Sequence, residues 1–377
     1  MKMKKKFFIS LLILSFGILS IILFGKHKTY TEIDGIKYAI QVNGTSSNTF
    51  PSGNYKSDVS CTNAHGYWDN AARKVIVESI TGSVICDISF TSITSSDYLN
   101  TYITGLNNTT QGDGKVVSEN GYRYEGKNPN NYIWFNNELW RIIGVFDSSS
   151  HGLSGKNLVK IIRDESIGGL AWDKNNSNDW VSSSLKALLN GAYYNHTIDT
   201  ENCYQYSTTV PGTCDFTAKG IRNEYQNMIE NVTWYLGGGG KDGYTTYTPD
   251  SVYGYERNSD AIYSGNSAST TGKIGLMYES DYLYGVLASD CVRTTAHNLY
   301  GTNSCAGKDW LSGQGDVWSI SPNHGNAKYV WYVKYYGYVY FTYANAGLAV
   351  RPVLYLSSSV YRVSGTGSLT DPYIIGM

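Results

Sequence analysis

The stretch YIWFNNELWRIIGVF, residues 132–146, places two apolar runs on either side of a short polar turn. Aromatic and β-branched residues in such runs favour strands, and the pair Asn136-Asn137 between them is typical of a tight turn. Residues 158–163, LVKIIR, indicate a third strand. Together these patterns predict an antiparallel sheet near the start of a large domain, which we place at residues 126–377.

Helical patterns interrupt the strands of this domain. One helix, capped by Ser182 or Ser183, is predicted to end near residue 190. A second spans residues 219–236, with apolar side chains every three or four positions, and a short third spans residues 281–287. Strand patterns return in residues 317–320, 329–343, 349–356, 360–363 and 373–375. Because the helices group between sets of strands rather than alternate with them, we predict an α+β class.

A smaller domain is predicted upstream. Residues 35–44, GIKYAIQVNG, alternate apolar and polar side chains and end in an Asn-Gly turn signal, and residues 74–78 and 84–88 indicate two further strands. We therefore expect a small β module at residues 29–92. Residues 93–125 are rich in Ser, Thr, Asn and Gly with few large aliphatic side chains, a composition typical of a polar linker.

The N-terminus has the features of an export signal. Four lysines, at positions 2, 4, 5 and 6, precede an uncharged apolar run from residue 7 to residue 25. A run of this length suffices to cross a membrane as a helix, and the lysine excess places the N-terminus in the cytoplasm. Because no A-x-A site follows, we predict a signal anchor and transmembrane helix at residues 1–28. The alternative is a product secreted after cleavage.

Charge and composition narrow the class of partner. Residues 29–377 contain 24 basic and 31 acidic residues, and a body of this net charge does not favour nucleic acid. The chain has 34 Tyr and 9 Trp, side chains that supply rigid, amphipathic contact area in recognition surfaces. Tyr is also a good strand residue in a glycine-rich β protein, so these aromatic residues can equally belong to the core.

The six cysteines of the chain indicate a disulfide framework, since their number is even and the chain is exported. Fifteen pairings are formally possible. We expect pairing in chain order, which closes three short loops. The expected pairs are Cys61 with Cys86, Cys203 with Cys214, and Cys291 with Cys305. No CxxC or HxxxH spacing supports a zinc site instead.

Catalytic motifs are missing from the sequence. It contains no GxSxG elbow, no HExxH motif and no complete phosphate-binding loop, and its six histidines are scattered through polar stretches. We therefore assign no catalytic residue.

A few residues are candidates for binding. In residues 173–179, DKNNSND, oxygen side chains stand at alternate positions as in a calcium loop, and the candidate Ca²⁺ ligands are Asp173, Asn175, Ser177 and Asp179. The Gly at position six and the carboxylate at position twelve of such a loop are absent, and an Asx-rich turn before a helix explains the same letters.

Three further side chains are candidates for contact with a ligand, namely Trp172, Trp180 and Arg351. Arg351 lies in a predicted strand between Val350 and Val353. It either pairs with an acidic residue, for which Asp164 and Glu165 are the candidates, or faces a ligand.

Several motifs of residues 126–377 resemble a known family. These are NYIWFNNELWRIIGVF, KIIRDE, a W-x-x-SSLKALLN helix, IGLMYESDYLYG and VRPVLYLSSSVYRVSGTGSLTDPY, in this order. They are similar to an uncharacterised domain family of bacterial surface and secreted proteins. That family is remotely similar to the C-type-lectin-like fold of formylglycine-generating sulfatase modifiers. The resemblance implies a C-type-lectin-like domain, but no reactive cysteine pair matches that of the modifying enzymes.

Three functional hypotheses follow. The first is a membrane-anchored protein whose extracellular domain binds a glycan, a cell-wall component or a host surface molecule, either for adhesion or for recognition. The second is a structural protein of the cell envelope, in which the aromatic residues form the core. The third is an exported enzyme distantly related to formylglycine-generating enzymes, which requires two reduced cysteines in a cleft.

Overall fold

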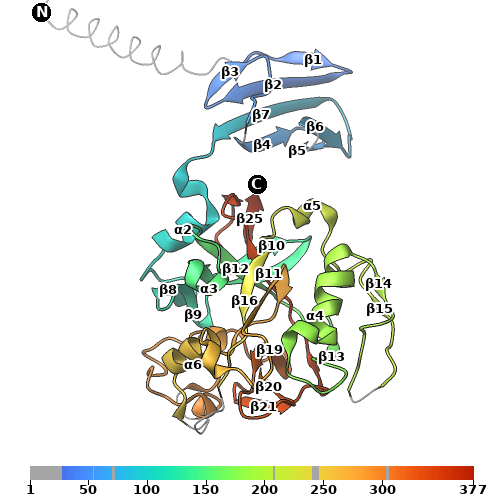
Figure 1. Cartoon of the computed structure of the whole chain (residues 1–377). Helices are drawn as coiled ribbons and strands as arrows, with labels where there is room; N and C mark the ends of the chain where they lie inside the picture. Colours follow the sequence, from blue (N-terminus) through green and yellow to red (C-terminus); the bar gives the residue numbers. More distant parts are fainter. Residues whose placement is uncertain (1–27, 54, 70–72, 207–208, 240–245, 303–304) are drawn as a thin grey trace, which may run out of the picture. The chain divides into compact units, whose positions relative to one another are not determined.

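The computed structural model describes residues 28–53, 55–69, 73–206, 209–239, 246–302 and 305–377 (Figure 1). Among the described residues, strands make up 37% and helices 16%. The predicted α+β class is therefore wrong, and the protein is mostly β. The chain divides into two compact units, Met1–Thr94 and Ser95–Met377.

Residues 219–236 differ from the predicted secondary structure. The single long helix predicted at residues 219–236 is instead a short helix, α5 (Asn223–Gln226), followed by a strand, β16 (Val232–Tyr235). The run Val-Thr-Trp-Tyr of this strand consists of β-branched and aromatic residues, which pack well on a pleated sheet. It pairs antiparallel with β17 (Ser269–Gly272), a long-range partner that periodicity cannot reveal.

The smaller unit is a β module. Its main sheet has the strand order β1-β2-β7-β4, and β3 also pairs with β2. The bounds are β1 (Thr31–Ile33), β2 (Ile36–Val42), β3 (Thr45–Ser47), β4 (Tyr55–Cys61) and β7 (Val84–Ser92). A separate hairpin consists of β5 (His65–Asp69) and β6 (Lys74–Glu78). Alternate side chains of β2 and β7, among them Ile40, Ile88 and Phe90, form the core against this hairpin.

The larger unit is built around the hairpin with which the sequence analysis began. Its strands β10 (Tyr132–Phe135) and β11 (Glu138–Phe146) pair antiparallel, and Asn136 and Asn137 form the turn with φ of 59° and 60°. Asn tolerates this left-handed conformation, which a two-residue hairpin turn requires. The sheet prediction is confirmed here.

The main sheet of the larger unit extends on both sides of this hairpin, in the order β18-β23-β12-β11-β10-β25-β24, and β9 joins β8 to β11. The remaining strands are β8 (Asp113–Ser118), β9 (Tyr122–Asn128), β12 (Leu158–Arg163), β18 (Ile274–Gly275), β23 (Val353–Leu356), β24 (Tyr361–Ser364) and β25 (Tyr373–Gly376).

A second sheet of the larger unit has the order β13-β22-β19-β20-β21. Its strands are β13 (Gly169–Ala171), β19 (Val317–Pro322), β20 (Tyr329–Val333), β21 (Val339–Tyr343) and β22 (Gly347–Ala349). A short ladder joins β14 (Ile198–Asp199) to β15 (Cys214–Asp215). The α-helices are short, namely α2 (Leu99–Gly105), α3 (Ser148–His151), α4 (Ser184–Leu188), α6 (Pro249–Glu256) and α7 (Glu279–Leu283).

The segment for which the composition predicts a linker, residues 93–125, carries α2, β8 and part of β9. Leu99 and Ile103 of α2 and Val116 of β8 are fully buried in the core of the larger unit. These three apolar side chains therefore make the segment part of the folded core of the larger unit.

The predicted transmembrane helix lies outside the described residues. Among the residues that the structure does describe, no helix is long and apolar enough to cross a membrane. The anchor at residues 1–28 stays a prediction.

Three disulfides link Cys61 to Cys86, Cys203 to Cys214, and Cys291 to Cys305, which is the expected pairing in chain order. All six cysteines of the sequence are thereby oxidised. Disulfides persist in oxidising compartments, so the protein belongs to an extracellular or secreted environment.

We predict that the Cys61–Cys86 link stabilises the smaller unit. Cys61 and Cys86 are directly paired across β4 and β7 and close a loop with a sequence separation of 25. Replacing both by Ser should lower the free energy of unfolding of this unit by roughly 3 to 4 kcal/mol, the value expected for a loop of this length. Hydrogen exchange should then accelerate in β4 and β7 but not in β10 and β11. Unchanged exchange in β4 and β7 would contradict this assignment.

Candidate functional site

The two tryptophans predicted to contact a ligand lie in the core. Trp172 and Trp180 have exposed fractions of 0% and 1%, and their ring centroids are 5.0 Å apart. The indole N–H of Trp172 donates to the carbonyl of Ser319 at 3.1 Å, which ties this pair to the second sheet. Both rings pack against protein on all sides, so neither offers a face to a ligand in solution.

The predicted calcium loop is a set of backbone caps. The Oδ2 atom of Asp173 accepts from the backbone N–H groups of Asn175 and Ser177 at 2.9 and 3.1 Å, and its Oδ1 atom accepts from that of Ser184 at 3.2 Å. Asp179 caps the next turn by accepting from the N–H of Val181 at 3.3 Å. Within the described ranges, no group of three or more His, Cys, Asp or Glu side chains could hold a metal ion.

Arg351 is 1% exposed and serves the packing of the larger unit. Its Nε and Nη1 atoms donate to the carbonyls of Arg163 and Leu311 at 2.9 and 3.2 Å, and Nη2 lies 3.9 Å from Asp164 Oδ1. Burial lowers the pKa of Arg351 to about 10, and the charge of Asp164 opposes this shift. Of the two alternatives for this residue, the structure contains the ion pair with Asp164.

A buried cluster of charges, which we had not predicted, crosses the larger unit. Asp281 of α7 forms ion pairs with Arg123 of β9, at 3.1 Å, and with Lys160 of β12. All three side chains are at most 2% exposed. Burial lowers the pKa of Lys160 to about 8, whereas the charges of Lys160 and Arg123 outweigh burial and lower the pKa of Asp281.

The same cluster continues around the start of α7. Glu256 of α6 accepts from the backbone N–H and the hydroxyl of Ser280, at 2.9 and 2.5 Å, and pairs with Arg257 at 3.0 Å. Arg293 pairs with Glu125 and Glu119 at 2.7 and 2.5 Å. Because the central charges are almost inaccessible and paired with one another, they hold elements together and do not meet a substrate in this conformation.

Exposed aromatic rings form the surface feature best suited to binding. Tyr335 and Tyr336, which follow β20, have exposed fractions of 62% and 43%, and Tyr338 and Tyr340 are half-buried. Consecutive ring centroids along this series are 4.9, 6.4 and 5.8 Å apart. The ammonium group of Lys334 lies 5.7 Å from the ring centroid of Tyr336 and 5.6 Å from that of Tyr340. We call these four tyrosines the tyrosine surface.

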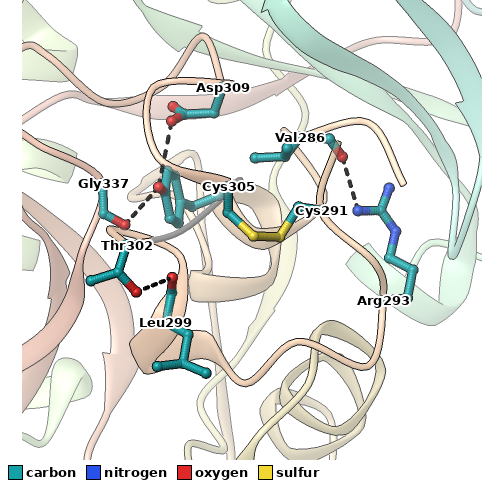
Figure 2. Close-up of a disulfide and its surroundings, with 9 residues drawn as sticks. Val286, Cys291, Arg293, Leu299, Thr302, Cys305, Asp309 and Gly337 are labelled. Atoms are coloured by element: carbon teal, nitrogen blue, oxygen red, sulfur yellow. Dashed lines mark hydrogen bonds between the residues drawn. A yellow bond between two sulfur atoms is a disulfide. The ribbon is translucent and has the colours of Figure 1, made fainter. Parts of the chain in front are cut away.

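One contact that holds the turn carrying the tyrosine surface is the dashed line drawn at the carbonyl of Gly337 in Figure 2. Gly337 has a φ of +89°, which favours glycine, and its carbonyl accepts from the hydroxyl of Tyr282 of α7 at 2.7 Å. The loop closed by Cys291–Cys305 passes close by. A Cβ atom on Gly301 of this loop would lie 2.6 Å from the backbone nitrogen of Tyr338, so only glycine fits there.

A further aromatic group lies on the β20–β21 hairpin. Tyr329 packs at a centroid distance of 5.0 Å against both Phe341 and Tyr343, and Tyr343 is 49% exposed. The abundance of tyrosine in residues 329–343 was visible in the sequence, but its exposure was not, because strand alternation alone does not tell which face is covered.

Comparison with known proteins gives no match. No family model, no curated protein and no solved structure matches this chain. The resemblance of residues 126–377 to a family of bacterial surface and secreted proteins therefore stays a prediction.

We predict that Asp173→Ala destabilises the larger unit without any role for calcium. The variant leaves three backbone N–H groups without their acceptor, which should cost about 2 kcal/mol in urea unfolding. Calcium or a chelator should leave the melting temperature of the unmodified protein unchanged. A calcium-dependent rise that Asp173→Ala abolishes would contradict the capping role.

Glu125 should make stability depend on pH. Burial raises its pKa from 4.5 to about 8, and the charge of Arg293 opposes this shift. Since the pKa is higher in the folded than in the unfolded state, the contribution of Glu125 is fully present below about pH 4.5 and is lost as the pH rises through about 8. The difference in unfolding free energy between the unmodified protein and Glu125→Gln should therefore shrink from pH 5 to pH 8. An equal difference at both pH values would contradict the shift.

Proposed function

We propose that this protein acts outside the cytoplasm and binds carbohydrate through the tyrosine surface of its larger unit. The observation that carries the proposal is the row of four neighbouring tyrosine rings at the turn of the β20–β21 hairpin, of which Tyr335 and Tyr336 are exposed. The apolar C–H face of a sugar ring packs well on an aromatic ring, while its hydroxyl groups require polar partners. Tyrosine supplies both, because it combines an apolar ring with a polar hydroxyl.

Polar groups beside the rings fit the same class of ligand. Lys334 lies over two of the tyrosines, and the carboxylate of Asp316 accepts from the backbone N–H of Tyr335 at 3.0 Å. A binding surface of few charged and several aromatic groups provides both stacking and directional hydrogen bonds. The proposed place of this surface is the outer side of a bacterial cytoplasmic membrane, to which residues 1–28 would anchor the chain.

The other two hypotheses have less support. A structural envelope protein in which the aromatic residues are core does not account for tyrosines exposed side by side. An enzyme related to formylglycine-generating enzymes requires two reduced cysteines, whereas all six cysteines form disulfides. We therefore propose a binding protein.

The test is a carbohydrate binding measurement on the full chain in lipid nanodiscs. We expect saturable binding to a glycan and cell-wall panel, and at least tenfold weaker binding, about 1.4 kcal/mol, for the variant Tyr335→Ala with Tyr336→Ala. Tyr67→Ala is the matched control, because Tyr67 of the smaller unit is 42% exposed and should leave binding unchanged. Two results would refute the proposal. One is the absence of saturable binding, and the other is binding by the Tyr335→Ala, Tyr336→Ala variant that is as tight as binding by the Tyr67→Ala control.

A further inference from the structure

The smaller unit contains an apolar cavity that the proposed function does not use. Its volume is about 290 Å³, and its walls include Ile36 and Tyr38 of β2, Ile88 of β7, Val75 and Val77 of β6, and Phe50. The valines are partly exposed and Phe50 is 39% exposed, so the cavity is open to solvent. Exposed apolar area of this kind costs roughly 25 cal/mol per Å² relative to burial, which favours an occupant.

The cavity lies beside a free strand edge. Among the described residues, β6 pairs with β5 and with no other strand. The described lining includes residues of β6 but none of β5, so the cavity lies next to β6 rather than next to its partner strand. That edge presents backbone N–H and C=O groups which no strand pairs in this part of the chain.

These two features together select the class of occupant. A small apolar molecule would cover the cavity walls but would leave the strand edge unpaired. An extended polypeptide satisfies both, because its backbone pairs with the edge while alternate side chains enter the cavity. Val75 and Val77, two residues apart on β6, would then face apolar side chains of the added strand.

Charges at the two ends of β6 favour one orientation of the added strand. The strand reads Lys-Val-Ile-Val-Glu, and both Lys74 and Glu78 are exposed, although Glu78 already contacts His65 of β5 at 3.2 Å. In an antiparallel partner, the residue opposite Lys74 should be acidic and the residue opposite Glu78 basic, since opposite charges directly across a ladder stabilise it. Antiparallel pairing is also slightly more stable per residue than parallel pairing.

We propose that the smaller unit binds a partner polypeptide by strand addition to β6. The bound segment runs antiparallel to β6 and has the pattern basic, apolar, any residue, apolar, acidic, so that its two apolar side chains fill the cavity beside Val75 and Val77. This site lies in the smaller unit and is independent of the tyrosine surface in the larger one.

The test measures binding of two labelled peptides to the full chain in lipid nanodiscs by fluorescence anisotropy. The probe acetyl-TKVTVET-amide carries the proposed pattern, and acetyl-TEVTVKT-amide has the charges exchanged. We expect the first peptide to bind at least tenfold more tightly and to slow hydrogen exchange of the β6 amides. In the variant Lys74→Glu with Glu78→Lys the preference should reverse. Because these residues are opposite Asp69 and His65 of β5, hydrogen exchange of β5 and β6 in the unbound variant checks that the hairpin is intact.

Several outcomes would overturn the proposal. These are binding of neither peptide, equal binding of both, or a preference that the charge-exchanged variant does not alter. A dimer of the full chain that excludes both peptides would assign the edge to a second copy of the chain instead. A dansyl-labelled fatty acid that binds without competition from either peptide would assign the cavity to a small apolar molecule. Carbohydrate binding is unaffected in all these cases, so the two proposals fail separately.

Discussion

The ion pairs of Asp281 with Arg123 and Lys160 are the interaction on which the larger unit depends. Asp281 lies near the start of α7, and its two partners lie on β9 and β12 of the main sheet. Removing one partner would leave a buried, uncompensated charge, which typically costs 3–5 kcal/mol, although a buried pair is not necessarily more stable than an apolar one. The main effect of these ion pairs is therefore to determine the position of α7. Their net contribution to stability is small by comparison.

The position of α7 in turn determines the tyrosine surface. Tyr282, the residue after Asp281, donates its hydroxyl to Gly337 at the turn between β20 and β21. The start of the same helix is capped by Glu256, and the loop closed by Cys291–Cys305 lies against Tyr338 through Gly301. Continuous contacts thus connect the main sheet, α7, the loop closed by Cys291–Cys305 and the β20–β21 hairpin. A change in the buried cluster would be expected to reach the exposed rings through it.

Local sequence patterns predicted those parts of the fold whose interacting residues are close together in the sequence. The β10–β11 hairpin and the three disulfides have partners within 25 residues, so spacing and turn residues were sufficient. The helix predicted at residues 219–236 was wrong because Val232–Tyr235 pairs with a distant strand. The partners Thr233 and Thr271 are 38 residues apart, outside any periodic window. The buried charge cluster could not be predicted from the sequence for the same reason. Lys160 within LVKIIR was a visible signal of a buried charge, but Asp281 follows 121 residues later.

Rigid support of the exposed tyrosines is what the proposed binding role requires. A tyrosine side chain loses little conformational freedom on binding, and a turn already fixed by Tyr282 and Gly337 loses less still. Lys334, held over Tyr336 and Tyr340, restricts these two rings further. The proposed site at β6 differs in this respect. A two-stranded hairpin is marginally stable by itself, so an added third strand would increase its order. If both proposals hold, the larger unit is organised before it meets a ligand, whereas the hairpin of the smaller unit gains a third strand from a partner.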